Sequence, residues 1–479
     1  MRIFLWIIVL ILSASSYAQD LEVRTIGGTG VDVFYDVLRT TDGYVAVGST
    51  SSTSSGSSDI LVVKLDDDMN TVWSRIIGTD GADEGNSIAQ NMDGNYVIVG
   101  STSFGDTGGY DVFLGIVDPD GSVLQQRTYG TPNWDFGTAA ELWNAEVWIG
   151  AKRFNPENNH FELWLFSIDG AGNQLNSRTW SLSGDAEIKD LLAQNDSLLM
   201  SIQMDTNEAL TAHVMAINDS LTEIWSTELE YTDVEGVLAG HLDYNEISGL
   251  GWSVSLLNTI DFEDECALVT LDLDGAVTGI YPVASTGDQY GYTMVWSNNL
   301  AMVTAESNVY GAGGLGIYLE RRINNGIWTE ATVFGGIRDE TPWRIIQDEE
   351  GRLIIAGQSN SYDGLTMDGF LMRIPNDLLL EEHEYNFDLQ QDISNTYTNI
   401  ELCTDDAVHV FPNPATDFIF IGGTNGEIYY EMFDFNGTLI QEGQGLYKIN
   451  LDMDLSNGLY FIHWQESGVD YSSKFLINR

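Results

Sequence analysis

Short apolar runs, each bounded by Gly, Asp or Asn, recur in pairs along most of the chain. The first run of each pair is clearest in three segments: 42–50, 93–102 and 351–359. The second run follows at 59–65, 111–117 and 368–374. Near-continuous runs rich in β-branched residues and closed by turn residues are typical of strands that are buried on both faces. The pattern therefore predicts stacked β-sheets.

A turn marker follows the second run of each repeat at nearly constant spacing. The seven markers are Asp66, Asp118, Asp169, Asn218, Asp272, Asn324 and Pro375, at intervals of 52, 51, 49, 54, 52 and 51 residues. A period of roughly 50 residues that holds about four short strands is the sequence signature of a β-propeller. We predict an all-β fold with a seven-bladed propeller. Six or eight blades are the alternatives, because repeats three to six are divergent.

The seventh repeat lacks the outer strand that other repeats have, such as 72–78, because it runs directly into Pro375. A matching segment, 22–28, lies before the first complete repeat. Pairing of the two ends would close the ring and remove an exposed sheet edge. We therefore expect the last blade to contain strands from both ends of the propeller.

The loops differ between the two faces expected for such a ring. Turns between the first and second strands of a blade are tight, as at 41–43, and share a face with those between the third and fourth strands. The remaining connections are long and variable, as at 49–58, 151–161 and 252–265. Since binding residues concentrate on such loops, we expect a ligand on that second face.

One turn resembles the tryptophan-docking turn of quinoprotein dehydrogenase propellers. It combines Asp66, Asn70 and Trp73, and Trp225 and Trp328 stand at comparable positions in later repeats. The resemblance implies that this turn fastens neighbouring blades and is not an active site.

The period stops after Pro375. Residues 376–407 form an acidic linker, and a second module occupies 408–479, where apolar and polar residues alternate between Asn-Gly turns. That alternation predicts a small Ig-like β-sandwich. Residues 1–18 combine Arg2, an apolar run and a small-residue end, which is the pattern of a secretory signal peptide. The propeller is then expected to span 19–375.

Ordered motifs in the second module carry a specific resemblance. Their key residues are Pro412, Asn413, Pro414, Asp417, Asn436, Gly437, Gly458, Tyr460 and Lys474. The module resembles the type A C-terminal sorting domain of cargo of the Bacteroidetes type IX secretion system. The resemblance implies handling by the type IX machinery and passage through the periplasm to the outer cell surface or the medium. Cleavage, anchoring and release stay open, and a purely structural sandwich is the alternative.

The chain carries 72 acidic and 19 basic side chains and a net charge of −53. Nucleic acid is therefore a poor partner, since its phosphates need a basic groove. We expect a monomer without a membrane span, because no run after residue 18 approaches the ~18 apolar residues that a span needs. Cys266 and Cys403 are the only cysteines, and both one bridge and two free thiols fit the sequence.

An acidic residue stands where the innermost strand of every repeat is expected to begin. The seven are Asp32, Asp83, Asp135, Asp185, Glu235, Asp288 and Asp339. Carboxylates crowded around one channel mouth favour a cation, which suggests Ca²⁺ or a cationic ligand without fixing metal ligands. The alternative is that each carboxylate caps backbone N–H groups and ties its blade to the next. Trp134 and Trp343 lie beside two of the seven and suit sugar binding, although such rings also pack between blades.

The sequence gives little support for catalysis. The six His are scattered, and the sequence has no Gly-x-Ser-x-Gly elbow, phosphate loop or Cys-x-x-Cys pair. No catalytic residue is therefore assigned. We predict a secreted or cell-surface binding module whose ligand is a glycan or a surface protein. The alternative is an extracellular carbohydrate-active enzyme, a hydrolase or a lyase, that uses the carboxylates at the channel mouth.

Overall fold

The computed structural model describes most of the propeller and parts of the second module. In the propeller it describes residues 22–375 except 53–56, 104–108, 207–208, 232–233, 258–263, 283–288, 298–299, 308–314, 324–327, 336–337 and 362–365. Beyond it, it describes 384–386, 410–411, 418–421, 428–434, 439–445, 448–451, 455, 458–466 and 469–477. The expected signal peptide and Cys403 lie outside these residues. Within them all regular elements are β-strands, so this part of the chain holds no helix that could cross a membrane.

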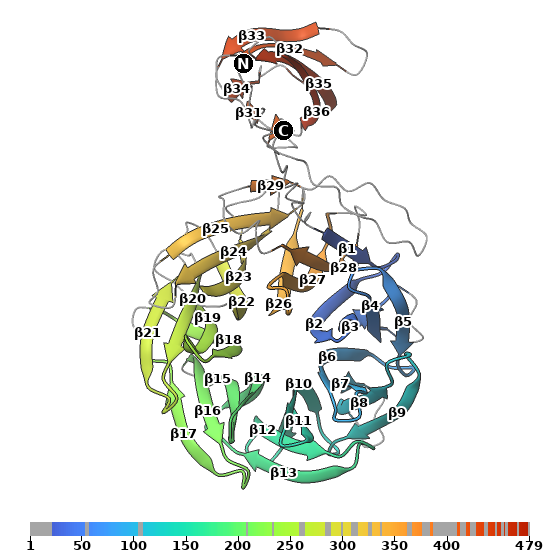
Figure 1. Ribbon diagram of the computed structural model, residues 1–479, viewed down its shortest axis with the longest axis vertical. Helices are drawn as coiled ribbons and strands as arrows, with labels where there is room; N and C mark the ends of the chain where they lie inside the picture. Colours follow the sequence, from blue (N-terminus) through green and yellow to red (C-terminus); the bar gives the residue numbers. More distant parts are fainter. Residues whose placement is uncertain are drawn as a thin grey trace, which may run out of the picture.

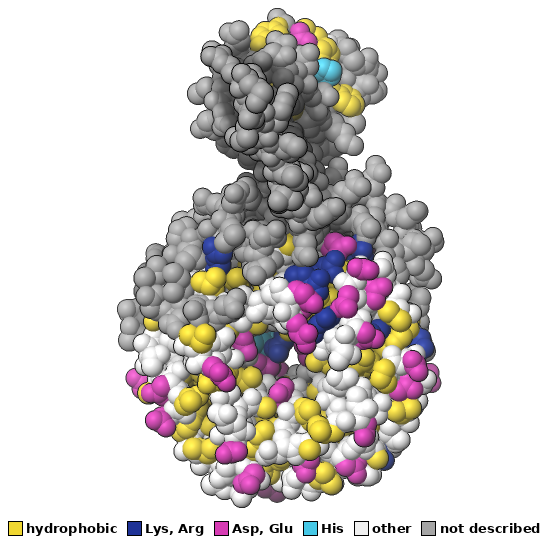
Figure 2. Space-filling model, viewed as in Figure 1, with side chains coloured by type: hydrophobic (Ala, Val, Ile, Leu, Met, Phe, Trp, Pro, Cys, Tyr) yellow, Lys and Arg dark blue, Asp and Glu magenta, His cyan; other side chains and the backbone are white. Residues whose placement is uncertain are grey.

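Seven four-stranded antiparallel blades surround a central channel in the described part of the chain (Figure 1). This confirms the seven-bladed propeller that the repeat spacing predicts. Each blade runs from an innermost strand at the channel to an outermost strand at the rim. Figure 2 shows one opening of the channel, with acidic side chains spread over the surrounding face. Blades 4 and 5 are additionally joined by a parallel bridge between Leu210 and Gly236.

The strands follow the repeat in chain order. Blades 1 to 3 consist of β2 (Asp32–Thr40), β3 (Gly43–Thr50), β4 (Asp59–Leu65) and β5 (Thr71–Ile77); β6 (Asp83–Gln90), β7 (Tyr96–Thr102), β8 (Asp111–Val117) and β9 (Val123–Tyr129); and β10 (Asp135–Trp143), β11 (Glu146–Asn155), β12 (His160–Ile168) and β13 (Gln174–Trp180). Blades 4 and 5 consist of β14 (Asp185–Gln194), β15 (Ser197–Asp205), β16 (Leu210–Ile217) and β17 (Glu223–Glu228); and β18 (Gly236–Asn245), β19 (Gly249–Leu257), β20 (Glu265–Leu271) and β21 (Val277–Pro282). Blade 6 consists of β22 (Gln289–Ser297), β23 (Leu300–Ser307), β24 (Gly316–Ile323) and β25 (Trp328–Gly335), with β29 (Glu384–Asn386) added parallel to β25. Blade 7 consists of β26 (Glu340–Gln347), β27 (Leu353–Ser359), β28 (Asp368–Ile374) and β1 (Glu22–Ile26).

The same side-chain hydrogen bonds build the turn between the third and fourth strands of successive blades. Asp66 Oδ1 accepts from the backbone N–H groups of Asp68 at 3.0 Å and Asn70 at 2.8 Å. Asp169 and Asp272 bind the amides two and four residues ahead in the same way. Because Asp and Asn can fold the chain over their own amides, these residue types recur as turn markers.

Buried apolar clusters fill the junctions between neighbouring blades. At the junction of blades 1 and 2, Val47 and Val62 pack with Ile98 and Phe113. Clusters of the same kind lie at the other junctions. Both faces of each blade are therefore covered, which explains the continuous apolar runs of the second and third strands. The thiol of Cys266 belongs to one of these clusters and is buried.

Tryptophans on outermost strands fasten adjacent blades at the rim. Trp73 Nε1 donates to the carbonyl oxygen of Pro119 in blade 2 at 2.9 Å. Trp225 Nε1 donates to the carbonyl oxygen of Leu273 in blade 5 at 3.0 Å. These contacts confirm the docking role expected for the two tryptophans, while the side chain of Trp328 lies outside the described residues.

The ring closes through β1, the strand nearest the N-terminus. β1 pairs antiparallel with β28, from Glu22 opposite Arg373 to Ile26 opposite Gly369. The expectation that both ends of the propeller share the last blade is therefore confirmed. Arg24 on β1 is buried, and its Nε donates to the carbonyl oxygen of Met69 in blade 1 at 3.1 Å.

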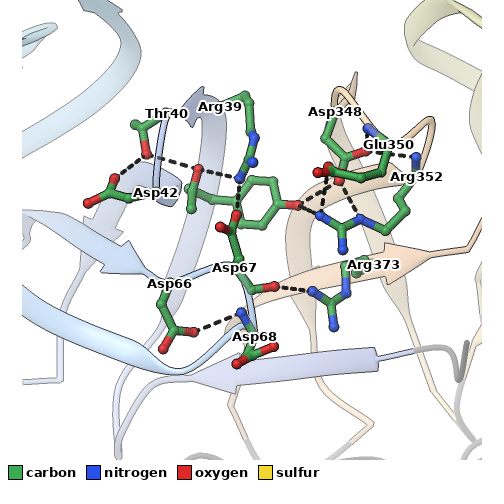
Figure 3. A network of polar contacts seen from close by, with 12 residues as sticks. Arg39, Thr40, Asp42, Asp66, Asp67, Asp68, Asp348, Glu350, Arg352 and Arg373 are labelled. Carbon is green, nitrogen blue, oxygen red and sulfur yellow. Dashed lines mark hydrogen bonds and ion pairs between the residues drawn. The ribbon is translucent and has the colours of Figure 1, made fainter.

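A polar network joins blade 7 to blade 1 (Figure 3). Tyr44 Oη donates to Asp348 Oδ2 at 2.8 Å, and Arg352 Nε donates to the same carboxylate oxygen at 2.6 Å. Arg373 donates to the backbone carbonyl of Asp67. Charge-assisted hydrogen bonds of this kind are stronger than neutral ones, so they reinforce the junction between the last blade and the first.

The second module consists of two small sheets. One has the order β30 (Val410–Phe411), β31 (Phe418–Ile421) and β34 (Lys448–Asn450); the other has the order β33 (Leu439–Gly445), β32 (Ile428–Asp434), β35 (Gly458–Glu466) and β36 (Val469–Ile477). Met432, Ile462 and Trp464 from the larger sheet pack with Ile449 from the smaller one. Residues of both sheets thus share one core, as expected for the Ig-like sandwich. Of the motif residues, Tyr460 is buried in that core, whereas Pro412, Asn413, Pro414, Asp417, Asn436 and Gly437 lie outside the described residues.

Candidate functional site

Three of the seven predicted ring carboxylates are buried at blade junctions. We call Asp32, Asp83 and Asp135 the junction carboxylates. Asp83 Oδ2 accepts from the backbone N–H of Thr79 at 2.6 Å, and Asp135 Oδ2 makes the same bond with Thr131 at 2.6 Å. Asp32 Oδ2 accepts from a glycine amide four residues before it at 2.9 Å. Each accepted amide lies in the turn that leads from one blade to the next, so these contacts tie blade to blade.

The other four acidic residues lie in different environments. Asp185 is exposed and accepts from the backbone N–H of Phe161 at 2.7 Å, and Glu235 is exposed as well. Asp339 accepts from Leu315 N at 3.0 Å, whereas the following residue, Glu340, is the buried one at that strand start. Asp288 lies outside the described residues. Among the described side chains, no group of three or more acidic, His or Cys residues is arranged to hold a metal ion, and the expected Ca²⁺ stays a prediction.

A β-bulge interrupts the innermost strand of every blade at the same level of the channel. The register shifts lie between Phe34 and Asp36, Gly85 and Ser87, Gly137 and Ala139, Ile188 and Asp190, Ala239 and Leu242, Gly291 and Thr293, and Pro342 and Arg344. A bulge leaves an extra residue unpaired and re-aims its side chain. The extra residues are Tyr35, Asn86, Thr138, Lys189, Gly240 with His241, Tyr292 and Trp343, and of Tyr292 only the backbone is described.

The channel contains two cavities that meet at the bulges. The wide chamber, of about 470 Å³, is lined by residues that include Tyr35, Glu84, Phe136, Lys152, Glu187, Lys189, His241 and Trp343. The narrow chamber, of about 260 Å³, is lined by residues that include Asp36, Glu141, Asp190 and Arg344. Tyr35, Asn86, Thr138, Lys189 and His241 line both. The ring of bulge residues is therefore the boundary between the chambers, and Figure 2 shows basic side chains inside the opening.

Aromatic rings form part of the wall of the wide chamber. The rings of Tyr35 and Trp343 meet edge to face with their centroids 5.5 Å apart. Phe136 lines the chamber as well and stacks on Tyr110 at 5.0 Å. Glu84 lies near Tyr35 in this chamber, and burial raises the pKa of its carboxyl group. Flat rings beside polar groups are a surface on which a sugar ring can stack.

Two lysines from blades 3 and 4 form a second part of the wall. Lys152 Nζ donates to Glu187 Oε2 at 2.9 Å, and Lys189 Nζ donates to Glu187 Oε1 at 3.4 Å. The Lys152 ammonium also lies 5.4 Å from the ring centroids of Phe136 and Phe161. Burial by itself would raise the pKa of Glu187, but the two lysines outweigh it and hold the pKa below its ordinary value.

The narrow chamber contains an arginine among carboxylates. Arg344 Nε lies 3.5 Å from Asp36 Oδ1 of blade 1, and its Nη1 lies 3.4 Å from Asp190 Oδ1 of blade 4. Burial and the nearby Asp190 raise the pKa of Glu141 to about 7, and burial raises that of Asp243 to about 6. Asp36 and Asp190 also accept backbone N–H groups of the following blade, at 3.0 and 2.8 Å. The contacts at this end of the channel thus hold the blades together.

The two tryptophans that the sequence predicts as sugar-binding residues lie in different places. Trp343 lies in the wide chamber, whereas Trp134 is 55% exposed and is not among the residues that line either chamber. Sequence reasoning missed Lys152, Glu187, Lys189 and His241. Two features of the sequence could have located the bulge residues. Each bulge residue follows a predicted ring acid by a few positions on the innermost strand, and the strict alternation of apolar residues is broken there.

Comparisons with known proteins identify the second module. Residues 409–478 match the family described as secretion system C-terminal sorting domain. No curated protein matches the chain significantly. Similar solved structures include Drosophila Plexin A in complex with Semaphorin 1b, with a TM-score of 0.46 and 6% identity over 74% of this chain and 87% of that one. Another is the β-propeller domain of the trilobed protease from Pyrococcus furiosus, with a TM-score of 0.41 and 9% identity over 72% and 94%. Similarity at this level carries no information about a ligand or an activity.

Proposed function

We propose that this cargo of the type IX secretion system delivers its propeller to the cell surface or the medium as a glycan-binding module. The sorting domain at 409–478 is the export address. Outside the cell the propeller meets polysaccharides and surface proteins. Of these two partners, a glycan fits the chamber in the channel better, because a chain end can enter a cavity that a folded protein surface cannot.

The wide chamber is the observation that carries the proposal. Its volume of about 470 Å³ lies within the usual range for small-molecule sites, roughly 300–1,000 Å³. Tyr35 and Trp343 offer ring faces and edges, while Asn86 and His241 supply polar groups in the same chamber. Apolar rings that hold the sugar and polar groups that orient it are the two components of such a site.

Two tryptophan substitutions, one inside the wide chamber and one outside it, test the proposal. The full chain is screened against an array of oligosaccharides, and the affinity for each hit is measured by calorimetry. Trp343→Ala should weaken binding by about tenfold or more, because base or sugar stacking on an aromatic ring is worth on the order of 1–3 kcal/mol. Trp134→Ala, which removes an exposed tryptophan outside both chambers, should bind like the parent. Loss of binding in Trp134→Ala alone would place the ligand elsewhere.

A second candidate function is glycoside hydrolysis or elimination in the same chamber. Glu84 has a raised pKa and Glu187 a lowered one, and both line the cavity. Carboxyl groups whose environments drive their pKa values apart suit an acid and a base. If the chamber is catalytic, the full chain will release reducing ends or unsaturated products from the oligosaccharides that it binds. Glu84→Gln should then stop product release and keep binding, whereas binding without any products would contradict the enzyme.

A further inference from the structure

We infer that the glycan of the wide chamber carries a carboxylate, and that Lys152 and Lys189 bind this group. The inference rests on the glycan-binding function proposed above and adds the chemical class of the ligand: an acidic polysaccharide built with uronic acid residues.

The distribution of positive charge is the first observation. The chain has 72 acidic side chains and only five lysines, at 64, 152, 189, 448 and 474. Three of these lysines lie in the propeller, and Lys64 is buried in an ion pair with Asp42 at 2.5 Å. The remaining two, Lys152 and Lys189, line the wide chamber. The ammonium groups of the propeller that can face a ligand are thus gathered in one cavity.

The geometry of the two lysines is the second observation. Glu187 presents one oxygen to Lys152 and the other to Lys189, at 2.9 and 3.4 Å. The spacing of the two ammonium groups therefore matches the two oxygens of a carboxylate. Each ammonium has three N–H donors, so donors are left for a second carboxylate that arrives from the chamber. One resident carboxylate for two lysines also leaves a positive charge for the ligand to neutralise.

The lysines are held for this role by their surroundings. Lys152 stands over the rings of Phe136 and Phe161, which restrict its side chain and leave that side chain 26% exposed. Lys189 is a bulge residue, and its side chain is 41% exposed at the boundary of the chambers. Glu84 is the other carboxyl group in the chamber, and burial raises its pKa.

The acidic surface does not prevent this binding. At physiological ionic strength the Debye length is about 8 Å, so distant surface carboxylates are largely screened. The ammonium groups contact the ligand directly and are screened much less. Selectivity for an anion therefore depends on the lysines of the chamber and not on the net charge of the chain.

Paired sugar probes test the inference with the full chain. Oligogalacturonate, oligomannuronate and oligoglucuronate are each compared with their carboxyl-reduced, neutral counterparts by calorimetry. We expect at least one acidic probe to bind about tenfold or more tightly than its neutral counterpart, since hydrogen bonds to charged groups contribute roughly 1.5–3 kcal/mol. Lys152→Met and Lys189→Met should each reduce this preference. Lys448→Met, which removes a lysine of the second module, should keep the preference, and unfolding curves exclude loss of fold.

The outcomes separate the two proposals. Equal affinity for acidic and neutral probes, or a preference that survives both lysine substitutions, overturns the carboxylate inference while the glycan-binding function stands. Failure to bind any acidic probe overturns it as well. If neither these probes nor any oligosaccharide of the array binds, the glycan-binding function falls with it.

Discussion

At the scale of single residues, the buried carboxylates of this propeller act mainly on backbone amides. Asp83 and Asp135 each accept a turn N–H and the hydroxyl group of the same threonine. Asp190 and Asp243 accept an N–H group of the next innermost strand, at 2.8 and 2.6 Å. Much of the negative charge inside the ring is therefore used to join blades, and its loss should appear first as lost stability.

Removing one junction carboxylate should destabilise the propeller whether or not Ca²⁺ is present. In Asp83→Ala, the Thr79 amide and hydroxyl groups lose their acceptor, and the free energy of unfolding should fall by roughly 1.5–3 kcal/mol. Denaturant unfolding in EDTA and then in Ca²⁺ measures this. Asp185→Ala, at an exposed position, is the control and should change stability little. A loss that appears only when Ca²⁺ is present would instead support the cation ring.

The buried Glu141 should make stability depend on pH. Its pKa is about 7 in the folded chain and near 4.5 when unfolded, so between these values the folded state binds more protons. Its contribution to stability is therefore lost as the pH rises from about 4.5 to 7. Glu141→Gln should gain stability relative to the parent over this range, by no more than about 3 kcal/mol. Urea unfolding at several pH values checks this, with exposed Glu235→Gln as a control that should follow the parent.

At the scale of elements, the repeat is a blade whose turns are built for its neighbour. The turn between β20 and β21 takes its shape from Asp272, and it offers a carbonyl group to Trp225 of the previous blade. Gly275 completes the contact, since its φ of +86° suits glycine and a Cβ at this position would collide with the Trp225 ring. The turn therefore serves its own hairpin and the blade junction together.

Gly275→Ala should be clearly more destabilising than a glycine-to-alanine substitution at another position with a positive φ. Gly94 has a φ of +82°, but its Cβ would have no heavy atom closer than 3.9 Å, so Gly94→Ala measures backbone strain alone. That strain is worth about 1–2 kcal/mol. Gly275→Ala adds displacement of Trp225 and should lose about 1–3 kcal/mol more. Equal losses in the two variants, measured by denaturant unfolding, would show that the tryptophan contact contributes nothing.

At the scale of the whole molecule, the closed ring depends on a seam within blade 7, the pairing of β1 with β28, because these neighbouring strands are joined by hydrogen bonds and not by a continuous chain. β1 supplies the outer strand of blade 7, and Arg24 inserts between this blade and blade 1. The network around Asp348 then joins the innermost hairpin of blade 7 to β3. The chain itself runs from β1 of blade 7 into β2 of blade 1, as it does between the other blades, so the β1–β28 seam is the place where the ring would open first.

Deleting β1 should open the ring. Without Glu22–Ile26, the edge of β28 loses its partner and the buried face of blade 7 is exposed to water. We expect a lower and broader thermal transition and early proteolytic cleavage near blade 7. Arg24→Met, a milder change, should lower the transition temperature without broadening it. A sharp transition at the parental temperature in the deletion would contradict the role of the seam.

The sequence predicts the structural features that recur in every blade, and it does not single out the residues that differ between blades. Turn markers such as Asp66 and the β1 segment were accessible, because the same backbone geometry demands the same residue types in each blade. The bulge residues lie at similar positions in each blade but differ in residue type, with Tyr35, Thr138 and Lys189 as examples, so no recurring residue marks them. The acidic residue that recurs in every blade suggests a ring that binds a ligand, although recurrence in every blade favours a structural role. Differences among equivalent positions are the better guide to a ligand in a ring of repeats.

The pairing of β1 with β28 also sets the order in which the molecule can be completed. Glu22 and Arg373 are 351 residues apart, so the first strand to be synthesised waits for almost the whole propeller before it finds its partner. Folding that depends on such distant contacts is slow, because the entropy of closing a long loop precedes the gain. In an exported chain the ring therefore cannot close until nearly all of the propeller has been made, whatever the individual blades do earlier.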